Sequence, residues 1–222
     1  MMKKSDSQPS ALRGRPKTQD EASRRQSIIS HAFQAFIELG FAQTSTAEIA
    51  RRAKISKRTL YEAFSDKKAL FAAVIKQHRH LLLDLPRPKD EQHPLDETLF
   101  EIFRLNISED EFLERDAILR LMTRESILFP ELSDYLYESR AVRSRELLME
   151  WLQTTANEKH LPLDDVEMVA GLLMDVVFGA LVPHRRVSQT EERQKITAHI
   201  KRRIQIILLG TGWLNEAASQ QA

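Results

Sequence analysis

Four neighbouring side chains between positions 57 and 61 could bind nucleic acid. They are Lys57, Arg58, Thr59 and Tyr61. Lysine and arginine bind guanine acceptor edges and phosphates, threonine binds a thymine methyl group or a phosphate, and the tyrosine hydroxyl binds a phosphate. A basic helix that is simply solvated would carry the same cations, so the flanking segments have to decide between the two interpretations.

Those flanking segments predict two short helices separated by a tight turn. Ser45 and Glu48 spell a capping box, which starts a helix over about 46–53. Ser56 can cap another helix over about 57–63. Because a single basic helix has no need of a second cap, we expect the chain to turn between the two.

The apolar residues require these two helices to cross. Ala50 is small enough for a close crossing, and Leu60, ten residues later, supplies an apolar anchor on the second helix. This spacing is typical of a DNA-binding helix–turn–helix. Lys54 then lies in the turn, where its side chain must tolerate a strained or left-handed backbone at a cost of about 1 kcal/mol.

Two helix starts beside this motif could also bind a phosphate. The backbone N–H groups at Ser45 and Thr46 lie at the start of the first short helix, where they can donate to an anion. Lys67 lies in the first turn of the helix that follows the motif, where a cation opposes the helix dipole. An approaching phosphate would explain that placement.

The net charge of +1 conceals an uneven distribution along the chain. Residues 1–80 carry 16 Lys/Arg and 7 Asp/Glu, a balance of +9, whereas residues 81–222 carry 17 and 25, a balance of −8. A basic N-terminal third is typical of a phosphate-binding surface, although a solvated basic face would have the same composition.

The rest of the chain predicts an all-α protein. Leu, Ala, Glu, Arg and Lys dominate the composition, and no alternating pattern is long enough for a sheet. Beyond the proline-containing segment 85–94, we expect helices near 95–106, 109–128, 130–158, 164–183 and 190–214.

Several classes of protein are excluded by what the sequence lacks. It has no cysteine, which excludes disulfides and thiolate catalysis. It has no H-E-x-x-H, phosphate-binding loop, dinucleotide-binding loop or G-x-S-x-G. We therefore expect no enzyme activity, catalytic residue, cofactor or metal. The first residues lack a signal-peptide core and Asp175 interrupts the longest apolar region, so we expect a cytoplasmic protein without a membrane span.

The stretch ELGFAQTSTAEIARRAKISKRTLYEAFSDKKALFAAV, residues 38–74, closely resembles the DNA-binding domain of the tetracycline-repressor (TetR) family. The matching positions are Gly40-Phe41, Thr44 to Thr46, Ile49-Ala50, Ala53, Ile55-Ser56, Thr59 to Tyr61, Phe64, Lys67 and Leu70-Phe71. Two positions depart from the family pattern. Lys54 replaces a common glycine, and Ala63 replaces a frequent histidine or arginine, which puts one phosphate contact in doubt.

This resemblance implies a domain organisation and a set of DNA contacts. It implies a basic arm over 1–19, which we expect to be disordered, a three-helix DNA-binding domain over 20–66, and a larger ligand-binding and dimerisation domain over 67–222. The segment 120–140 is similar to the AefR-like C-terminal domain found in part of the family. The positions that match the usual DNA contacts are Thr46, Lys57, Arg58, Thr59, Tyr61 and Lys67.

The basic arm has two interpretations. Arg13 and Arg15, beside Gly14 and Pro16, could lie in a narrow minor groove, whose negative potential attracts guanidinium groups. Alternatively, the arm is a basic tail that adds only nonspecific attraction to DNA. The residue types are compatible with both.

The C-terminal half offers candidates for a dimer interface and a ligand cavity. The helices expected near 164–183 and 190–214 could pair with those of a second chain, as the resemblance implies, or form an intrachain core. Aromatic and methionine side chains could line an apolar cavity or simply form the core, namely Phe103, Met122, Phe129, Trp151, Met174 and Phe178. Glu125 could face a cationic ligand there, or pair with an arginine such as Arg124 or Arg120.

We therefore expect a DNA-binding transcription regulator. The resemblance favours a homodimeric repressor that binds a palindromic operator and is released by a largely apolar small molecule. The alternatives are an activator, a ligand-independent regulator, and a ligand-binding helical protein with a vestigial DNA domain. The cations Lys57, Arg58 and Lys67, together with Tyr61, argue against a vestigial domain.

Overall fold

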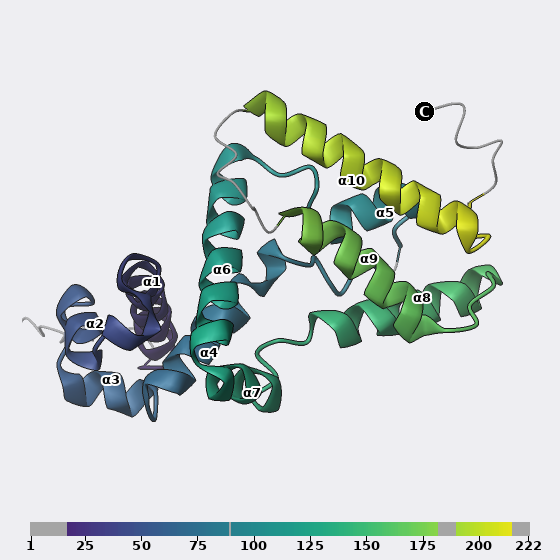
Figure 1. The fold of residues 1–222 in the computed structure, drawn as a ribbon. Coiled ribbons are helices and arrows are strands. Elements are labelled where there is room, and N and C mark those ends of the chain that lie inside the picture. The colour runs from purple at the N-terminus through teal and green to yellow at the C-terminus, as the bar shows by residue number, and fades with distance from the viewer. Residues whose placement is uncertain (1–16, 89, 182–189, 215–222) are drawn as a thin grey trace, which may run out of the picture.

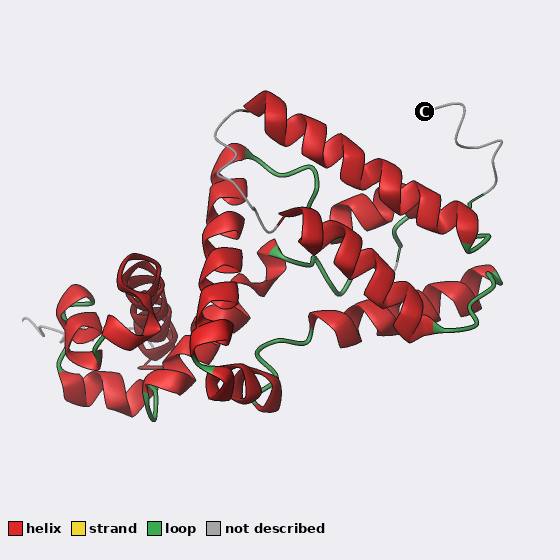
Figure 2. Ribbon diagram, viewed as in Figure 1, coloured by secondary structure: helices red, strands yellow, loops and turns green. Residues whose placement is uncertain are grey.

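The protein is built from helices joined by short loops. The computed structural model describes residues 17–88, 90–181 and 190–214. Within these ranges there are α-helices and one 3-10 helix but no strand, which confirms the all-α prediction (Figure 2). The elements in chain order are α1 (Lys17–Gln43), α2 (Thr46–Arg52), α3 (Lys57–Ala63), α4 (Lys67–His78), η1 (Arg79–Leu81), α5 (Leu95–Ile102), α6 (Glu109–Leu128), α7 (Pro130–Glu138), α8 (Ser144–Lys159), α9 (Val166–Leu181) and α10 (Thr190–Gly210).

Helix α6 stands between two groups of helices (Figure 1). One hydrophobic cluster joins α1 to α4 with α6 and α7. A second cluster joins α5 with α8, α9 and α10. Phe178 of α9 packs against both clusters. The helix–turn–helix region is therefore attached to the rest of the molecule chiefly through α4, α6 and α7.

Helix α1 bends at Gly40, whose φ of 81° and ψ of 167° are not helical. Such angles are essentially confined to glycine. Beyond the bend, the ring of Phe41 packs against those of Phe36 and Phe71, with centroids 5.9 and 5.3 Å away. The buried hydroxyl of Thr44 donates to the Gly40 carbonyl at 2.6 Å, which ties the end of α1 to the start of α2.

Side-chain caps begin both short helices, as the sequence predicts. The Ser45 hydroxyl accepts from the backbone N–H of Glu48 at 3.1 Å, and the Ser56 hydroxyl accepts from that of Thr59 at 3.0 Å. Between them, Lys54 has the expected left-handed backbone, with φ 53°. The N–H of the next residue, Ile55, donates to the carbonyl of Ala50 at 3.0 Å and closes the turn.

The single helix expected over 130–158 is wrong, because the chain forms two helices there. Helix α7 ends at Glu138 and α8 begins at Ser144. Between them Arg140 has φ 54°, and the N–H of Ala141 donates to the carbonyl of Leu136 at 3.0 Å. This break contains neither glycine nor proline, so the helical pattern of the sequence runs through it without a visible stop.

Helix α5 is also shorter than expected. It ends at Ile102, whereas the sequence predicted a helix to about residue 106. Arg104 has φ 53°, and the N–H of Leu105 donates to the carbonyl of Phe100 at 2.9 Å. A non-glycine residue in the left-handed region ends this helix too, and it leaves the carbonyls of the last turn open to a side chain from elsewhere.

Candidate nucleic-acid interface

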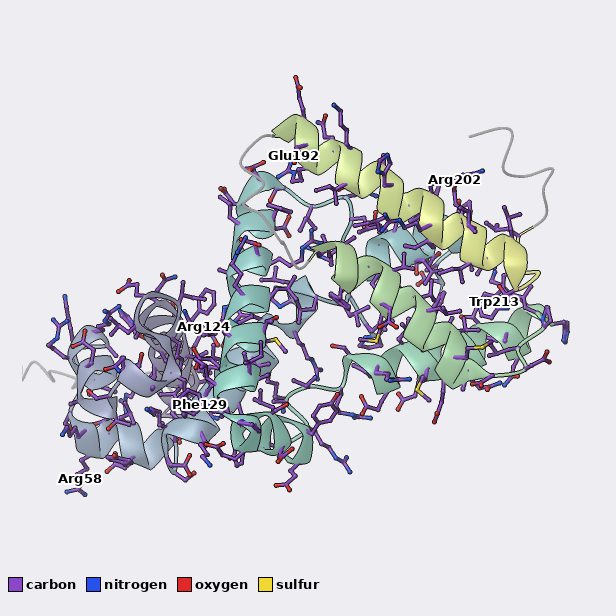
Figure 3. The ribbon with its side chains drawn as sticks, viewed as in Figure 1. Arg58, Arg124, Phe129, Glu192, Arg202 and Trp213 are labelled. Atoms are coloured by element: carbon purple, nitrogen blue, oxygen red, sulfur yellow. The ribbon has the colours of Figure 1, made fainter. Side chains whose placement is uncertain are left out.

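The surface of α3 separates apolar from polar residues as the sequence predicts. Leu60 is fully buried against the first cluster, whereas Lys57 and Arg58 are exposed and Tyr61 is 50% exposed. Figure 3 shows Arg58 at the lower left edge of the molecule. The exposed face of α3 is therefore free to enter a DNA groove.

The hydroxyls of Thr46 and Tyr61 lie 3.1 Å apart and form a hydrogen bond. This contact joins the start of α2 to the middle of α3. Ser45 is the N-cap of α2, so its hydroxyl and the first N–H groups of α2 lie beside the same pair. One phosphate could therefore contact the two hydroxyls and the helix N-terminus at the same time.

Arg58 and Thr59 are both engaged within α3. The Arg58 Nε donates to Glu62 Oε1 at 3.0 Å, and both side chains are exposed. The Thr59 hydroxyl lies 2.9 Å from that of Ser56, within the helix cap. The pairing with Glu62 uses the Arg58 Nε, and the Thr59 hydroxyl is shared with the cap.

The structure places Lys67 differently from the exposed cations of α3. Its ammonium donates to the carbonyls of Phe41 and Ala42, at 2.8 and 3.4 Å, and lies 4.3 Å from the centroid of the Phe41 ring. Partial burial lowers the pKa of Lys67, and the charge of Glu125 opposes that change. Lys67 thus ties α4 to the bend of α1, and its contact with a phosphate remains a prediction.

Arg25 of α1 is a cation at this surface that the sequence reasoning missed. Its Nη1 donates to the carbonyl of Ala63 at 2.5 Å, and its guanidinium lies 4.0 Å from the centroid of the Phe64 ring. It therefore brings a positive charge to the C-terminal end of α3, where Ala63 supplies none. The contact spans 38 residues, so no local pattern could have indicated it.

Two arginines at the end of α2 are fixed by one carboxylate. Glu48 accepts from Arg51 and Arg52 at 2.8 Å, and Arg52 also pairs with Glu38 of α1 at 2.7 Å. The hydrogen bonds from Arg51 and then Arg52 lower the pKa of Glu48 to about 2. The pair of Arg52 with Glu38 links α2, which carries Thr46, to α1.

The C-terminal end of α6 meets the bend of α1. Arg124 donates from Nε to Glu125 at 2.7 Å and from Nη2 to the carbonyl of Phe36 at 3.2 Å. The ring of Phe129 packs edge-on against that of Phe41, with centroids 5.8 Å apart. Figure 3 shows Arg124 and Phe129 on the side of α6 that faces α1. We call Arg124, Glu125 and Phe129, with their partners on α1, the elbow contact.

The expected ligand residues do not gather in one place. Glu125 is 2% exposed and belongs to the elbow contact, where Met122 and Phe129 pack against the first cluster. The remaining aromatic and methionine candidates lie with the second cluster, namely Phe103, Trp151, Met174 and Phe178. The pairing of Glu125 with Arg124 corresponds to the ion-pair alternative.

Trp151 lines a cavity of about 360 Å³ between the segment after η1, the start of α5 and the end of α8. Its other walls include Arg87, Glu91, Thr155 and Lys159. Arg87 is already paired with Asp84 and Glu91. The volume lies at the lower end of the range for small-molecule sites.

Some predictions fall outside the described residues. Arg13 and Arg15 are among them, as are residues 1–16 of the expected arm. In the described part of the chain, no helix is both long enough and apolar enough to cross a membrane.

Comparison with known proteins agrees with this geometry. Residues 28–74 match the family described as bacterial regulatory proteins, tetR family. Residues 103–209 match the AefR-like transcriptional repressor, C-terminal domain. The two regions together span more than half of the chain.

Similar proteins extend over most of the chain. The uncharacterized HTH-type transcriptional regulator YvkB of Bacillus subtilis (strain 168) is 24% identical over 71% of this chain and 80% of its own length. The solved structure of the flavonoid-responsive regulator FrrA is 28% identical, with 85% and 97% coverage and a TM-score of 0.56. That of Salmonella enterica GusR is 22% identical, with 84% and 95% coverage and a TM-score of 0.64. The chain therefore belongs to the TetR family of helix–turn–helix transcriptional regulators, which are not enzymes, and it carries an AefR-like C-terminal domain.

Proposed function

We propose that the protein is a repressor that binds a palindromic operator as a homodimer and is released by a small molecule bound in its C-terminal domain. The observation that carries the DNA-binding part is the exposed face of α3, with Tyr61 joined to Thr46 at the start of α2. The proposed DNA contacts are Ser45, Thr46, Lys57, Arg58, Thr59, Tyr61 and Lys67. A partner of this kind places the protein in the cytoplasm.

Helix α4 lies in the proposed C-terminal domain, 67–222, but it also packs against the proposed DNA-binding domain, 20–66. Helix α4 packs in the first cluster with α1, and it begins with Lys67, which holds the bend of α1. A ligand that moves α6 would therefore act on the DNA-binding domain through α4 and the elbow contact. Coupling of this kind is typically about 1–3 kcal/mol, and the ligand must bind the DNA-free form more tightly.

Two observations support a dimer and a ligand. Apolar side chains remain exposed on the last two helices, with Met168 and Leu172 on α9 and Ile206 on α10. Two such helices from each chain could form a four-helix interface. The relative FrrA is described as flavonoid-responsive, which supports a small-molecule effector and makes flavonoids a first set of compounds to test.

Selection of bound sequences from a random DNA pool tests this proposal. We expect the protein to enrich a palindrome whose half-sites are about one DNA turn, roughly 34 Å, or a multiple apart. Lys57→Ala/Arg58→Ala should lose that enrichment. Lys76→Ala/Lys159→Ala removes two exposed cations outside α3 and should keep it. No enriched palindrome, or the same palindrome bound equally by the first double variant, would contradict the assignment of α3.

A reporter gene placed behind the selected operator separates repression from activation. Expression should fall when the regulator is present and recover when the effector is added. Activation instead, or repression that no compound relieves, would support the corresponding alternative and contradict a ligand-released repressor.

A further inference from the structure

Helix α6 contains a buried arginine that is not one of the proposed DNA contacts. Arg115 is 3% exposed. Its Nη1 donates to the carbonyl of Arg104 at 2.7 Å and to that of Phe103 at 3.4 Å. These are carbonyls at the C-terminal end of α5, which carries only a partial negative charge. Among the described residues, no carboxylate forms an ion pair with Arg115.

Two further guanidinium groups reach the same part of α6. Arg104 pairs with Glu111 in the first turn of α6, one turn before Arg115 on the same face. Arg193 of α10 pairs with Glu109, and Figure 1 shows the start of α10 beside this end of α6. The guanidinium groups of Arg115 and Arg193 lie 5.4 and 5.0 Å from the centroid of one ring, that of Phe112. We call Arg104, Arg115 and Arg193 the arginine cluster.

The charges of the arginine cluster do not balance. Glu109 and Glu111 neutralise two of its three cations, and Asp116 is paired with Arg120 at 2.7 Å. Burial, and after it the charges of Arg104 and Arg193, together lower the pKa of Arg115 to about 10, against the opposing charge of Asp116. A buried cation costs free energy unless an anion pairs with it. One positive charge is therefore left without a counterion among the described residues.

Hydrogen-bond donors are also left over. The Nε of Arg104 is buried and finds no hydrogen-bond partner in the described part of the chain. Arg115 uses only its Nη1 in the hydrogen bonds of the described residues, and a guanidinium group carries five N–H donors in a planar fork. Such a fork fits a carboxylate or phosphate with two parallel bonds.

Further aromatic rings lie on the neighbouring helices. The ring of Phe103, whose carbonyl accepts from Arg115, packs against Phe178 of α9 with centroids 6.1 Å apart. Lys201 of α10 lies 5.0 Å from the ring of Phe100, which adds another cation to the aromatic surroundings. The ring that lies next to the guanidinium group of Arg115 itself is that of Phe112.

We propose that the arginine cluster binds an organic anion, with its carboxylate held by Arg104 and Arg115 and its apolar body against Phe112. This inference rests on the proposed function, because it names the chemical class of the effector. Helix α6 carries Arg115 near one end and Arg124 of the elbow contact nine residues later, about 14 Å along the axis. An anion that shifts α6 would therefore act on the bend of α1.

Titration calorimetry of the full-length protein without DNA tests the site. The probes are benzoate and cinnamate, with benzyl alcohol and cinnamyl alcohol as uncharged counterparts, at constant ionic strength. We expect the carboxylates to bind and the alcohols to bind at least about tenfold more weakly, since each loses charge-assisted hydrogen bonds. Arg115→Met should lose the same factor for the carboxylates. Arg202→Met, at an exposed position on α10, should bind them like the wild type.

Each outcome decides the inference. Equal binding of acids and alcohols by the wild type, or no binding of either, overturns the arginine cluster as an anion site. Equal carboxylate binding by Arg115→Met overturns it too. If Arg115→Met does not fold, Arg104→Met and the preference of the wild type for acids over alcohols take its place.

A parallel measurement of operator binding separates this inference from the proposed function. Carboxylates that bind without weakening operator binding support the arginine cluster and contradict ligand release through it. Release by an uncharged compound, with no carboxylate binding, contradicts the arginine cluster alone.

Discussion

Glu125 of α6 lies directly against Gly40 at the bend of α1. A Cβ atom added to Gly40 would lie 3.2 Å from the Glu125 Oε1 and 3.3 Å from the Arg124 Nη2. The bend itself has φ 81°, which side chains rarely tolerate. The closeness of α6 to the DNA-binding domain therefore depends on the absence of one side chain.

Gly40→Ala should destabilise the protein, because the backbone at this position is essentially restricted to glycine. We expect a loss of about 1–3 kcal/mol in the free energy of unfolding, measured by urea titration. Gly210→Ala is the matched control, since Gly210 is helical and has no atom within 4 Å of an added Cβ. It should be neutral or stabilise by up to about 1 kcal/mol. Equal effects of the two substitutions would contradict the strain at the bend.

Lys54→Gly should stabilise the helix–turn–helix. The turn holds Lys54 at φ 53°, which costs an ordinary residue about 1 kcal/mol and glycine almost nothing. The gain should appear in urea unfolding as a higher midpoint with an unchanged slope. Lys76→Gly, at an exposed position inside α4, should instead lose about 1 kcal/mol. A loss for Lys54→Gly as large as that for Lys76→Gly would mean that the turn has another conformation.

Glu48 should make stability depend on pH in acid. Its pKa lies at about 2, below the ordinary 4.5, so the unfolded chain binds more protons than the native one in this interval. Its stabilisation is therefore complete above about pH 4.5 and is lost as the pH falls towards about 2. As the pH is lowered through that window, the free energy of unfolding of Glu48→Gln should decrease less than that of the wild type.

Carbon-13 NMR titration of the Glu48 carboxyl group checks the cause. Arg51→Met/Arg52→Met should raise its pKa towards 4.5, because those hydrogen bonds lower it. A wild-type carboxyl that titrates near 4.5 would show that the two arginines are not held as described.

The local parts of this structure were predictable from the sequence. Ser45 and Ser56 each cap a helix where the sequence places a start signal, and the turn at Lys54 follows from the spacing of apolar residues. Local hydrogen bonds of this kind need only neighbouring residues, so a short window contains them. The exposed face of α3, with its cations and Tyr61, could be predicted for the same reason.

The long-range parts were not predictable. Arg25 reaches Ala63, and Arg124 reaches the carbonyl of Phe36 across 88 residues. Both partners are backbone carbonyls, which leave no signature in the residue types. The break between α7 and α8 was missed for a related reason, since Arg140 adopts the left-handed backbone without being glycine.

Glu62→Gln should strengthen DNA binding. Glu62 holds the Arg58 Nε at 3.0 Å on the exposed face of α3 and would repel approaching phosphates. Removing its charge frees Arg58 at the cost of an exposed ion pair, so we expect operator affinity to rise about two- to fivefold at low salt. Glu150→Gln breaks a similar exposed pair, with Arg143 on α8, and should leave affinity unchanged. Weaker binding by Glu62→Gln would mean that the ion pair positions Arg58 for DNA.

Leu172→Asp should dissociate the proposed dimer. Leu172 of α9 is 45% exposed, and Met168, one turn away, is 55% exposed. These exposed apolar side chains lie on a helix that is strongly apolar as a whole. In a two-fold interface each substitution occurs twice, so two carboxylates would lose their water together. We expect a monomer by sedimentation equilibrium and a loss of operator affinity of at least about tenfold, because one recognition helix reads only one half-site. Ile127→Asp, at a 74% exposed position near the opposite end of α6 from α10, adds the same charge and should remain dimeric. A Leu172→Asp protein that stays dimeric and binds the palindrome like the wild type would place the interface on another surface.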